Sequence, residues 1–382
     1  MGVPTSMLGS YLLHRGCFFN CKWFKIIQSN HMPRVLVVAT SRKTRGGITS
    51  VIKAHETGEQ WKRFHCRWIE THRDGSILRK LWYLATSIIE YVCLLPFYDI
   101  VHIHIATTSS AKRKRIFLRL AKMLNKIVIF HFHPSNEKFL FEPNNKALYH
   151  KLFSEADLTL VLSRQWQRWI NDALNLQDKI KVLYNPCPQI ARREDLRKNH
   201  ILFAGTIIQR KGYETLLRGF AIIAKKYPQW KIVFAGNGEI EKAKSIAVEL
   251  NIENQVDFKG WVSGIEKTRV FQEASIYCLA SESEGFPMGV LDAWAYGLPC
   301  VVTPVGGLPD IVKDGENALV FPVGNIEVLS QQLEKLISNI DLRAKISKAS
   351  IGLANNTFNI KNINTELGQI YETLYKHKST LC

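Results

Sequence analysis

The strongest constraint on the fold is a regular alternation of short apolar runs with helix-length segments, which occurs twice along the chain. The runs are nearly continuous in Val, Ile and Leu, as is typical of parallel strands that helices cover on both faces. We therefore predict two doubly wound α/β domains with parallel sheets. The expected strands are 34–40, 64–70, 99–105, 126–132, 158–162 and 180–184 in the first half, then 200–204, 231–235, 255–258, 275–279, 299–302 and 318–321 in the second.

A break in this alternation divides the chain. Residues 185–199 contain two prolines and a polar, charged run, which is typical of a linker between domains. We predict an N-terminal domain over 32–190 and a C-terminal domain over 199–365. Residues 366–382 are expected to form a helix that packs back on the N-terminal domain. A cleft between two such domains is the natural place for a ligand, at the carboxyl ends of the strands.

The first 31 residues show no clear period, and Met32 leads directly into the first strand. We expect this segment to be a poorly ordered extension, with Met32 as a candidate start of the folded chain. A signal peptide is the weaker alternative, because the charged start, apolar centre and small-residue cleavage site do not occur in order.

Positive charge is concentrated in the first half of the chain. Residues 1–190 hold 28 Lys and Arg against 12 Asp and Glu, whereas 191–382 hold 23 against 21. Such a surface attracts anionic lipid, nucleic acid or phosphorylated substrates. A basic cluster at 112–122 falls on a predicted helix, whose apolar residues are expected to face the core: Ile116, Phe117, Leu120, Met123 and Leu124. Its basic face is either simply solvated or a membrane contact.

Segment 77–98 is very apolar, but Glu90 and two early basic residues interrupt it. The chain has no uncharged apolar run of about 18 residues, so a conventional membrane-spanning helix is not predicted. We expect this segment to be a buried helix, and contact with a membrane surface is the alternative.

Two stretches in the second half carry the chemistry. In 278–312 a strand is followed by a loop with Glu284 and Gly285, and then by a helix start near Pro287, where free N–H groups favour an anion. In 201–220 a strand ends at Gly205, and Arg210 and Lys211 precede a second helix start. Two cations at such a place can neutralise a diphosphate without a metal ion. A third glycine-rich turn, FAGNGE, lies at 234–239.

These motifs, in the order AGT, RKG, AGNGE, SESEGFPMGVLDAWAYGLP and VGGLPDIV, resemble the retaining glycosyltransferases of family 4, which have the GT-B fold. The resemblance covers about 33–375. It implies catalytic roles for Glu284 and His133, the latter after the strand KIVIFHF. It implies donor-binding roles for Gly46, Gly47, Thr206, Arg210, Lys211, Gly236, Gly238, Trp261, Val262, Gly285, Phe286, Pro287 and Asp292.

The chain departs from the family pattern at two positions. Thr206 stands where the family usually has Arg, and Asp292 stands where it usually has Glu. We expect Arg210 to compensate for the missing cation. The shorter Asp292 is expected to alter the ribose contact or to make it through water.

Two His-X-His pairs, His102 with His104 and His131 with His133, lie on neighbouring predicted strands. Residues two apart face the same side of a strand, so these imidazoles can converge on a zinc ion. We expect instead buried, hydrogen-bonded histidines and no metal, as the resemblance implies.

The resemblance implies a transferase that moves a sugar from a UDP or GDP donor to a saccharide or lipid-linked acceptor, without a cofactor and with retention of configuration. We expect it in bacterial cell-surface polysaccharide biosynthesis, in the cytoplasm and peripherally on the membrane. A GT-B sugar-nucleotide epimerase and a noncatalytic sugar-nucleotide-binding protein are alternatives. A nucleic-acid-binding protein is a third, although no single-strand or zinc-finger motif supports it.

Overall fold

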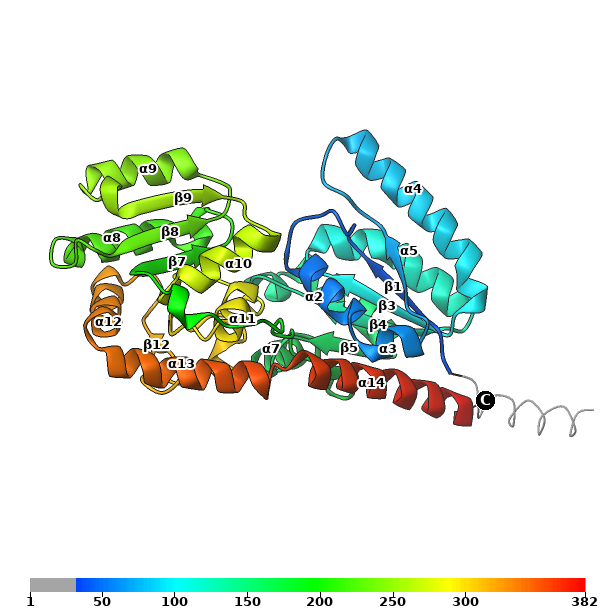
Figure 1. The fold of residues 1–382 in the computed structure, drawn as a ribbon. Coiled ribbons are helices and arrows are strands. Elements are labelled where there is room, and N and C mark those ends of the chain that lie inside the picture. The colour runs from blue at the N-terminus through cyan, green and yellow to red at the C-terminus, as the bar shows by residue number, and fades with distance from the viewer. Residues whose placement is uncertain (1–31, 382) are drawn as a thin grey trace, which may run out of the picture.

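The computed structural model describes residues 32–381, and it forms two α/β domains side by side (Figure 1). The N-terminal domain is built on a six-stranded parallel sheet in the order β2-β1-β3-β4-β5-β6. Its strands are β1 (Val35–Ala39), β2 (Arg67–Glu70), β3 (Ile100–Ile105), β4 (Ile127–Phe132), β5 (Leu158–Val161) and β6 (Ile180–Val182). Its helices are α2 (Gly47–Glu56), α3 (Glu59–Arg63), α4 (Ile77–Leu94), α5 (Thr108–Met123), α6 (Pro143–Glu155) and α7 (Arg164–Leu174).

The C-terminal domain holds a second parallel sheet, in the order β12-β11-β10-β7-β8-β9. Its strands are β7 (His200–Ala204), β8 (Lys231–Ala235), β9 (Val256–Gly260), β10 (Ile276–Leu279), β11 (Cys300–Val302) and β12 (Leu319–Val320). The helices are α8 (Tyr213–Ala224), α9 (Ile240–Glu249), α10 (Gly264–Glu273), α11 (Met288–Ala295), α12 (Ile326–Ser338), α13 (Ile340–Asn355) and α14 (Ile360–Leu381). Both sheets and the predicted fold class are thereby confirmed, and every predicted strand range contains a strand.

The last helix joins the two domains. After α13 the chain crosses back, and α14 runs along the N-terminal domain (Figure 1). Three contacts fix it there: Asn364 Oδ1 lies 2.7 Å from His55 Nδ1, the Tyr371 hydroxyl lies 2.7 Å from His102 Nδ1, and Glu372 pairs with Arg63. The helix begins at Ile360, so the predicted boundary at 366 falls inside it. The predicted extension 1–31 lies outside the described residues.

Two expectations about the N-terminal domain are wrong. Helix α4 is not buried, because only Ser87 and Tyr91 among its residues are buried. Phe117 of α5 packs in the core as expected, but Ile116 and Met123 of the same helix, and Leu124 just after it, are exposed. Conversely Lys114, counted with the basic cluster, is buried and donates to the backbone oxygen of His104. In both helices the apolar residues lie on more than one face. The spacing alone did not show which of these faces packs against the domain. Among residues 32–381, no helix is both long and apolar enough to cross a bilayer.

Candidate active site

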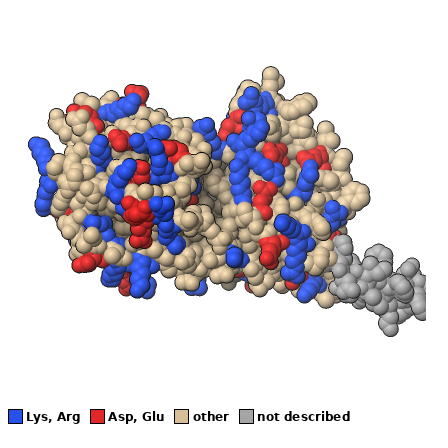
Figure 2. Space-filling model, in the orientation of Figure 1, with Lys and Arg blue, Asp and Glu red and all other residues tan. Residues whose placement is uncertain are grey.

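The predicted site residues lie at the carboxyl ends of parallel strands that face one another across the domain boundary. In the C-terminal sheet, β7 pairs with both β8 and β10, so the strand order reverses between β7 and β10. Ligands of open α/β sheets bind at such a reversal. Gly205 follows β7 and Glu284 follows β10, while His133 follows β4 of the other domain. Figure 2 shows a hollow between the two domains.

Glu284 is buried, and its carboxylate is held from two sides. Its Oε1 atom accepts from Lys211 Nζ at 2.5 Å and from Ser281 Oγ at 2.7 Å. The side chain of Glu284 is 8% exposed and that of Lys211 is 22% exposed, so the pair is shielded from water but reachable from the cleft. Burying a charge without a partner is costly, and this contact offsets that cost. The proposed catalytic carboxylate and the proposed diphosphate-binding amine are therefore one ion pair.

The loop that carries Glu284 is held by backbone contacts. Arg210 donates through Nη1 to the Ser283 oxygen at 2.5 Å, and the Arg210 oxygen accepts from the Glu282 N–H at 2.8 Å. Gly212 has φ +70°, and a Cβ there would lie 1.9 Å from the Ala280 oxygen. Only glycine therefore allows the 209–212 turn to approach the strand that leads to Glu284.

The same loop contacts the N-terminal domain. A Cβ on Gly285 would lie 2.1 Å from the Pro134 oxygen, and the indole nitrogen of Trp166 donates to the Gly285 oxygen at 2.8 Å. Phe286 is buried and packs in an aromatic cluster with Tyr184, Trp294 and Phe358. Glu284 is thus placed next to the residue that follows His133.

Two helix starts face each other across the domain boundary. Met288 begins α11, and its side chain lies 3.4 Å from the Cβ position of Gly47, which begins α2. Neither N-cap residue, Gly46 or Pro287, makes a side-chain capping bond. The first N–H groups of both helices can therefore bind an anion between the domains.

The other predicted donor-binding residues lie in four further segments. Trp261 is 41% exposed, and the guanidinium of Arg45 lies 5.2 Å from its ring centroid, across the domain boundary. Asp292 Oδ2 pairs with Lys267 Nζ at 2.7 Å. Burial raises the pKa of this carboxyl, and Lys267 opposes that shift. The remaining residues are exposed Thr206, half-buried Val262, and Gly236 and Gly238, where a Cβ would meet the Gly205 and Ile207 oxygens at 1.7 and 2.2 Å.

His133 heads a column of buried imidazoles. Its Nε2 atom lies 3.0 Å from His104 Nδ1, and His102 stacks on His104 with ring centroids 4.5 Å apart. His131 stacks on His102, and neither of its ring nitrogens has a hydrogen-bond partner. The column ends at Tyr371 of α14. It therefore connects the cleft to the helix that joins the two domains.

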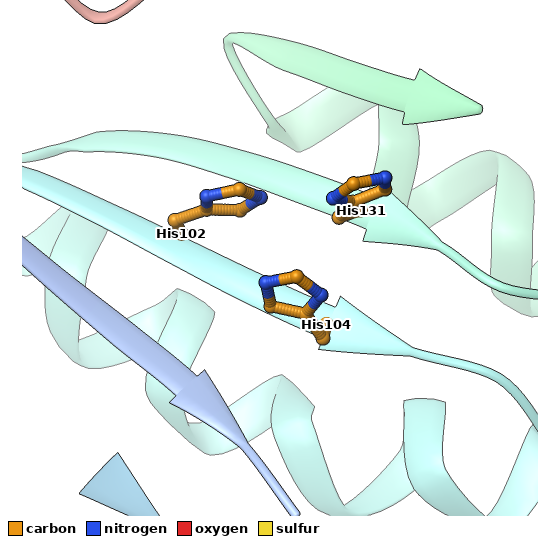
Figure 3. Close-up of side chains that lie close together, drawn as sticks. All are labelled: His102, His104 and His131. Atoms are coloured by element: carbon orange, nitrogen blue, oxygen red, sulfur yellow. The ribbon is translucent and has the colours of Figure 1, made fainter. Parts of the chain in front are cut away.

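Three imidazoles of this column lie at the spacing of metal ligands. One ring nitrogen from each of His102, His104 and His131 lies within 4.8 Å of the others (Figure 3). A metal ion must lie near the plane of every imidazole that binds it. The rings of His102 and His131 are stacked with an interplanar angle of 12°, and those of His102 and His104 with an angle of 24°. Their lone pairs therefore run nearly side by side and do not converge, so this arrangement does not fit a shared metal ion.

Burial sets the protonation of this region. It lowers the pKa of His102, His104 and His131 well below the usual value, and that of His133 to about 3. The pKa of Lys114 is lowered to about 7, first by burial and then by Arg113. The four imidazoles are therefore neutral at physiological pH, and His133 acts there as a hydrogen-bonding group rather than as a cation.

Sequence reasoning did not name several residues that lie at the candidate site: Arg45, Trp166, Lys267 and Ser281. The histidine pair spacing pointed to His104, but nothing local marked Lys267 as the partner of Asp292. Lysine and carboxylate lie on different helices, and only the packing of α10 against α11 brings them together.

The fold is similar to that of known glycosyltransferase structures. The fold is the GT-B fold of glycosyltransferases: 89% of this chain superimposes on the whole of Anabaena Alr3699/HepE in complex with UDP, with a TM-score of 0.72 at 16% identity. Sucrose-phosphate synthase from Thermosynechococcus elongatus gives a TM-score of 0.76 at 16% identity, over 90% of this chain and all of that one.

Residues 189–352 match the family model of glycosyl transferases group 1. An uncharacterized glycosyltransferase of Haemophilus influenzae is 35% identical over 41% of this chain and 44% of its own length. The amylovoran biosynthesis glycosyltransferase AmsK of Erwinia amylovora is 25% identical over 62% of this chain and 61% of its own length. The chain thus spans less than two thirds of these relatives. The matched domain and the relatives' names support a transferase with the GT-B fold.

Proposed function

We propose that this protein is a retaining glycosyltransferase of the family 4 type. It moves a sugar from a nucleoside-diphosphate donor to an acceptor hydroxyl without a metal ion. The observation that carries the proposal is the Lys211–Glu284 ion pair, which lies where the strand order reverses and next to the segment that carries His133. The UDP bound by the HepE protein, which has the same fold, supports a UDP donor, and GDP is the alternative.

In this proposal each residue of the site contacts a different part of the donor. The donor diphosphate lies between the starts of α2 and α11, with Lys211 turned from Glu284 toward its oxygens. Glu284 then binds hydroxyls of the donor sugar, and neutral His133 donates or accepts a hydrogen bond from the other side. Asp292 contacts the ribose, and Trp261 with Val262 contacts the base. Phe286 acts only by packing the loop.

In the proposed reaction the acceptor oxygen forms a bond to the anomeric carbon on the face that the diphosphate leaves. The bond to the diphosphate breaks with its electron pair, and the acceptor proton passes to a phosphate oxygen. The transition state is oxocarbenium-like. Lys211 and the two helix starts stabilise the charge that builds on the leaving group. Contact between the domains excludes water and so limits hydrolysis of the donor.

A thermal-shift series with UDP, GDP, ADP, CMP and their sugar conjugates, with and without EDTA, tests the proposal. A saturable rise with one nucleoside diphosphate, unchanged by EDTA, is expected. Loss of the rise with EDTA would contradict metal independence. A turnover assay with the nucleotide sugar that binds completes the test: binding with no turnover on any acceptor would favour a noncatalytic protein. Turnover of the donor sugar without an acceptor would indicate an epimerase.

Replacing Lys211 with Ala is expected to weaken binding of the nucleoside diphosphate by about 1.5–3 kcal/mol, because a charge-assisted contact to the phosphates is lost. The measurement is isothermal titration calorimetry with UDP and GDP. Lys225→Ala is the matched control, since Lys225 is exposed at the far end of α8. Equal affinity in the Lys211 variant and the wild type would remove Lys211 from the site.

Replacing Arg210 with Ala is expected to lower the same affinity by a smaller factor, because Arg210 also holds the Ser283 carbonyl. Arg210→Lys separates the two effects: it keeps the charge but loses the planar fork. If Arg210→Ala binds UDP as the wild type does, Arg210 does not compensate for Thr206.

We further propose cell-surface polysaccharide biosynthesis as the setting, with a saccharide or lipid-linked acceptor bound by the N-terminal domain. The name of the amylovoran relative and the basic N-terminal half support this. We also propose peripheral attachment to an anionic membrane on the cytoplasmic side, with no nucleic-acid partner, and the same charge supports the contact with anionic lipid.

A further inference from the structure

Helix α4 is apolar on two opposite faces, and the domain covers only one of them. Ser87 and Tyr91 point into the domain, and the Tyr91 hydroxyl donates to the Phe117 oxygen of α5 at 2.8 Å. The opposite face is exposed: Leu78 is 80% exposed, Trp82 69% and Ile89 65%. Leu81 and Val92 extend the same face. A row of exposed large apolar residues on one helix marks a surface that contacts something apolar.

Positive charge borders this face. Helix α5 contacts α4 and exposes Lys112, Ile116, Arg119 and Met123 at helical spacing. It contains no acidic residue. The only acid in α4 is Glu90, and Arg67 neutralises it at 2.9 Å. The surface therefore combines an apolar row with an adjacent cationic row and carries no unpaired acid in either helix.

We propose that this surface, the outer face of α4 together with the exposed row of α5, docks on an anionic lipid bilayer. Apolar side chains then enter the acyl boundary while Lys112 and Arg119 contact headgroup phosphates. Helix α4 lies in the interface without spanning it, in line with the absence of a spanning helix in residues 32–381. A second copy of the chain fits less well, because self-association about α4 brings two cationic rows together. This inference deepens the membrane contact of the proposed function by naming its surface.

The test is flotation of the full chain with vesicles of phosphatidylcholine alone or mixed with phosphatidylglycerol. Binding to the mixed vesicles is expected, with weaker binding to the neutral ones and at high salt, where charges are screened within about 3 Å. The double variant Leu78→Ser, Trp82→Ser is expected to lose at least about tenfold in partitioning, because the helix no longer offers an apolar face. Lys112→Glu with Arg119→Glu is expected to lose the preference for phosphatidylglycerol.

Matched controls lie on the C-terminal domain. Ile222→Ser with Ile265→Ser removes two apolar side chains that are also exposed, and Lys225→Glu with Lys348→Glu reverses two exposed charges. Both are expected to bind vesicles as the wild type does. The proposal is overturned if the wild type does not float with anionic vesicles, if the α4 variant binds equally well, or if sedimentation shows that the α4 face holds a dimer instead. Lipid binding is read without turnover, so it stands or fails separately from the transferase activity.

Discussion

Glu284→Gln is expected to reduce turnover by about 10²–10³-fold, the size of effect seen when one preorganised polar group is removed from an active site. The amide keeps the shape and the contact with Ser281 Oγ, but it loses the charge that holds Lys211 and orients the donor sugar. Binding of the nucleoside diphosphate is expected to stay equal or to tighten, since Lys211 no longer has a competing partner. Steady-state kinetics together with UDP titration separates the two effects.

The matched control for this change is Glu282→Gln. Glu282 lies in the same loop but is exposed, and its side chain has no hydrogen bond or ion pair among those found in residues 32–381. Its turnover is expected to equal that of the wild type. A near-wild-type rate for Glu284→Gln would remove this residue from catalysis, whereas an equal loss for Glu282→Gln would show that the loop's total charge is what matters. The Lys211 and Glu284 variants together separate binding from the chemical step.

The imidazole column is expected to make the protein unusually sensitive to mild acid. Burial holds the pKa of His102, His104, His131 and His133 far below 6.5 in the folded state. The unfolded chain therefore binds more protons as the pH falls through 6.5, and stability is lost. Between about pH 7.5 and 5.5 each such group costs about 1.4 kcal/mol, or roughly 5–6 kcal/mol for four. That is a large part of the stability of an ordinary domain.

Urea denaturation at several pH values measures this loss. His131→Phe keeps a stacked ring but removes one titrating group, so the loss between the same two pH values is expected to shrink by about 1.4 kcal/mol. His150→Gln is the control, because His150 is exposed on α6. Lys114 lowers the stability only as the pH falls toward its reduced pKa of about 7. Below that value it is protonated in both the folded and the unfolded state and contributes no further change. A free energy of unfolding that stays constant between pH 7.5 and 5.5 would contradict the prediction and would show that water reaches the buried imidazoles.

The positions of the strands along the chain and the residues that follow them were predictable, because both depend on local patterns. Continuous Val and Ile runs such as RVLVV and IVHIHI, between helix-length segments, are typical of parallel strands buried on both faces. Parallel strands put their carboxyl ends on one edge, so Gly205 and Glu284 were expected at the same edge of the sheet. The pairing of β7 with β10, which makes them neighbours, is visible only in the fold. The motif order then indicated what kind of ligand this edge receives.

The partners of these groups were decided only by tertiary packing. Glu284 and Lys211 were assigned to different parts of a donor, but the fold joins them in one ion pair. His102 meets Tyr371 across 269 positions of sequence, and no periodicity carries that information. The same limit explains α4 and α5, where the apolar spacing was correctly read but the covered face was not. The sequence by itself determined where the strands lie along the chain, that they form parallel sheets and which residues follow them, because these follow from local pattern. Which charges pair, which histidines stack and which apolar face stays open depend on contacts between distant segments, which only the folded chain makes.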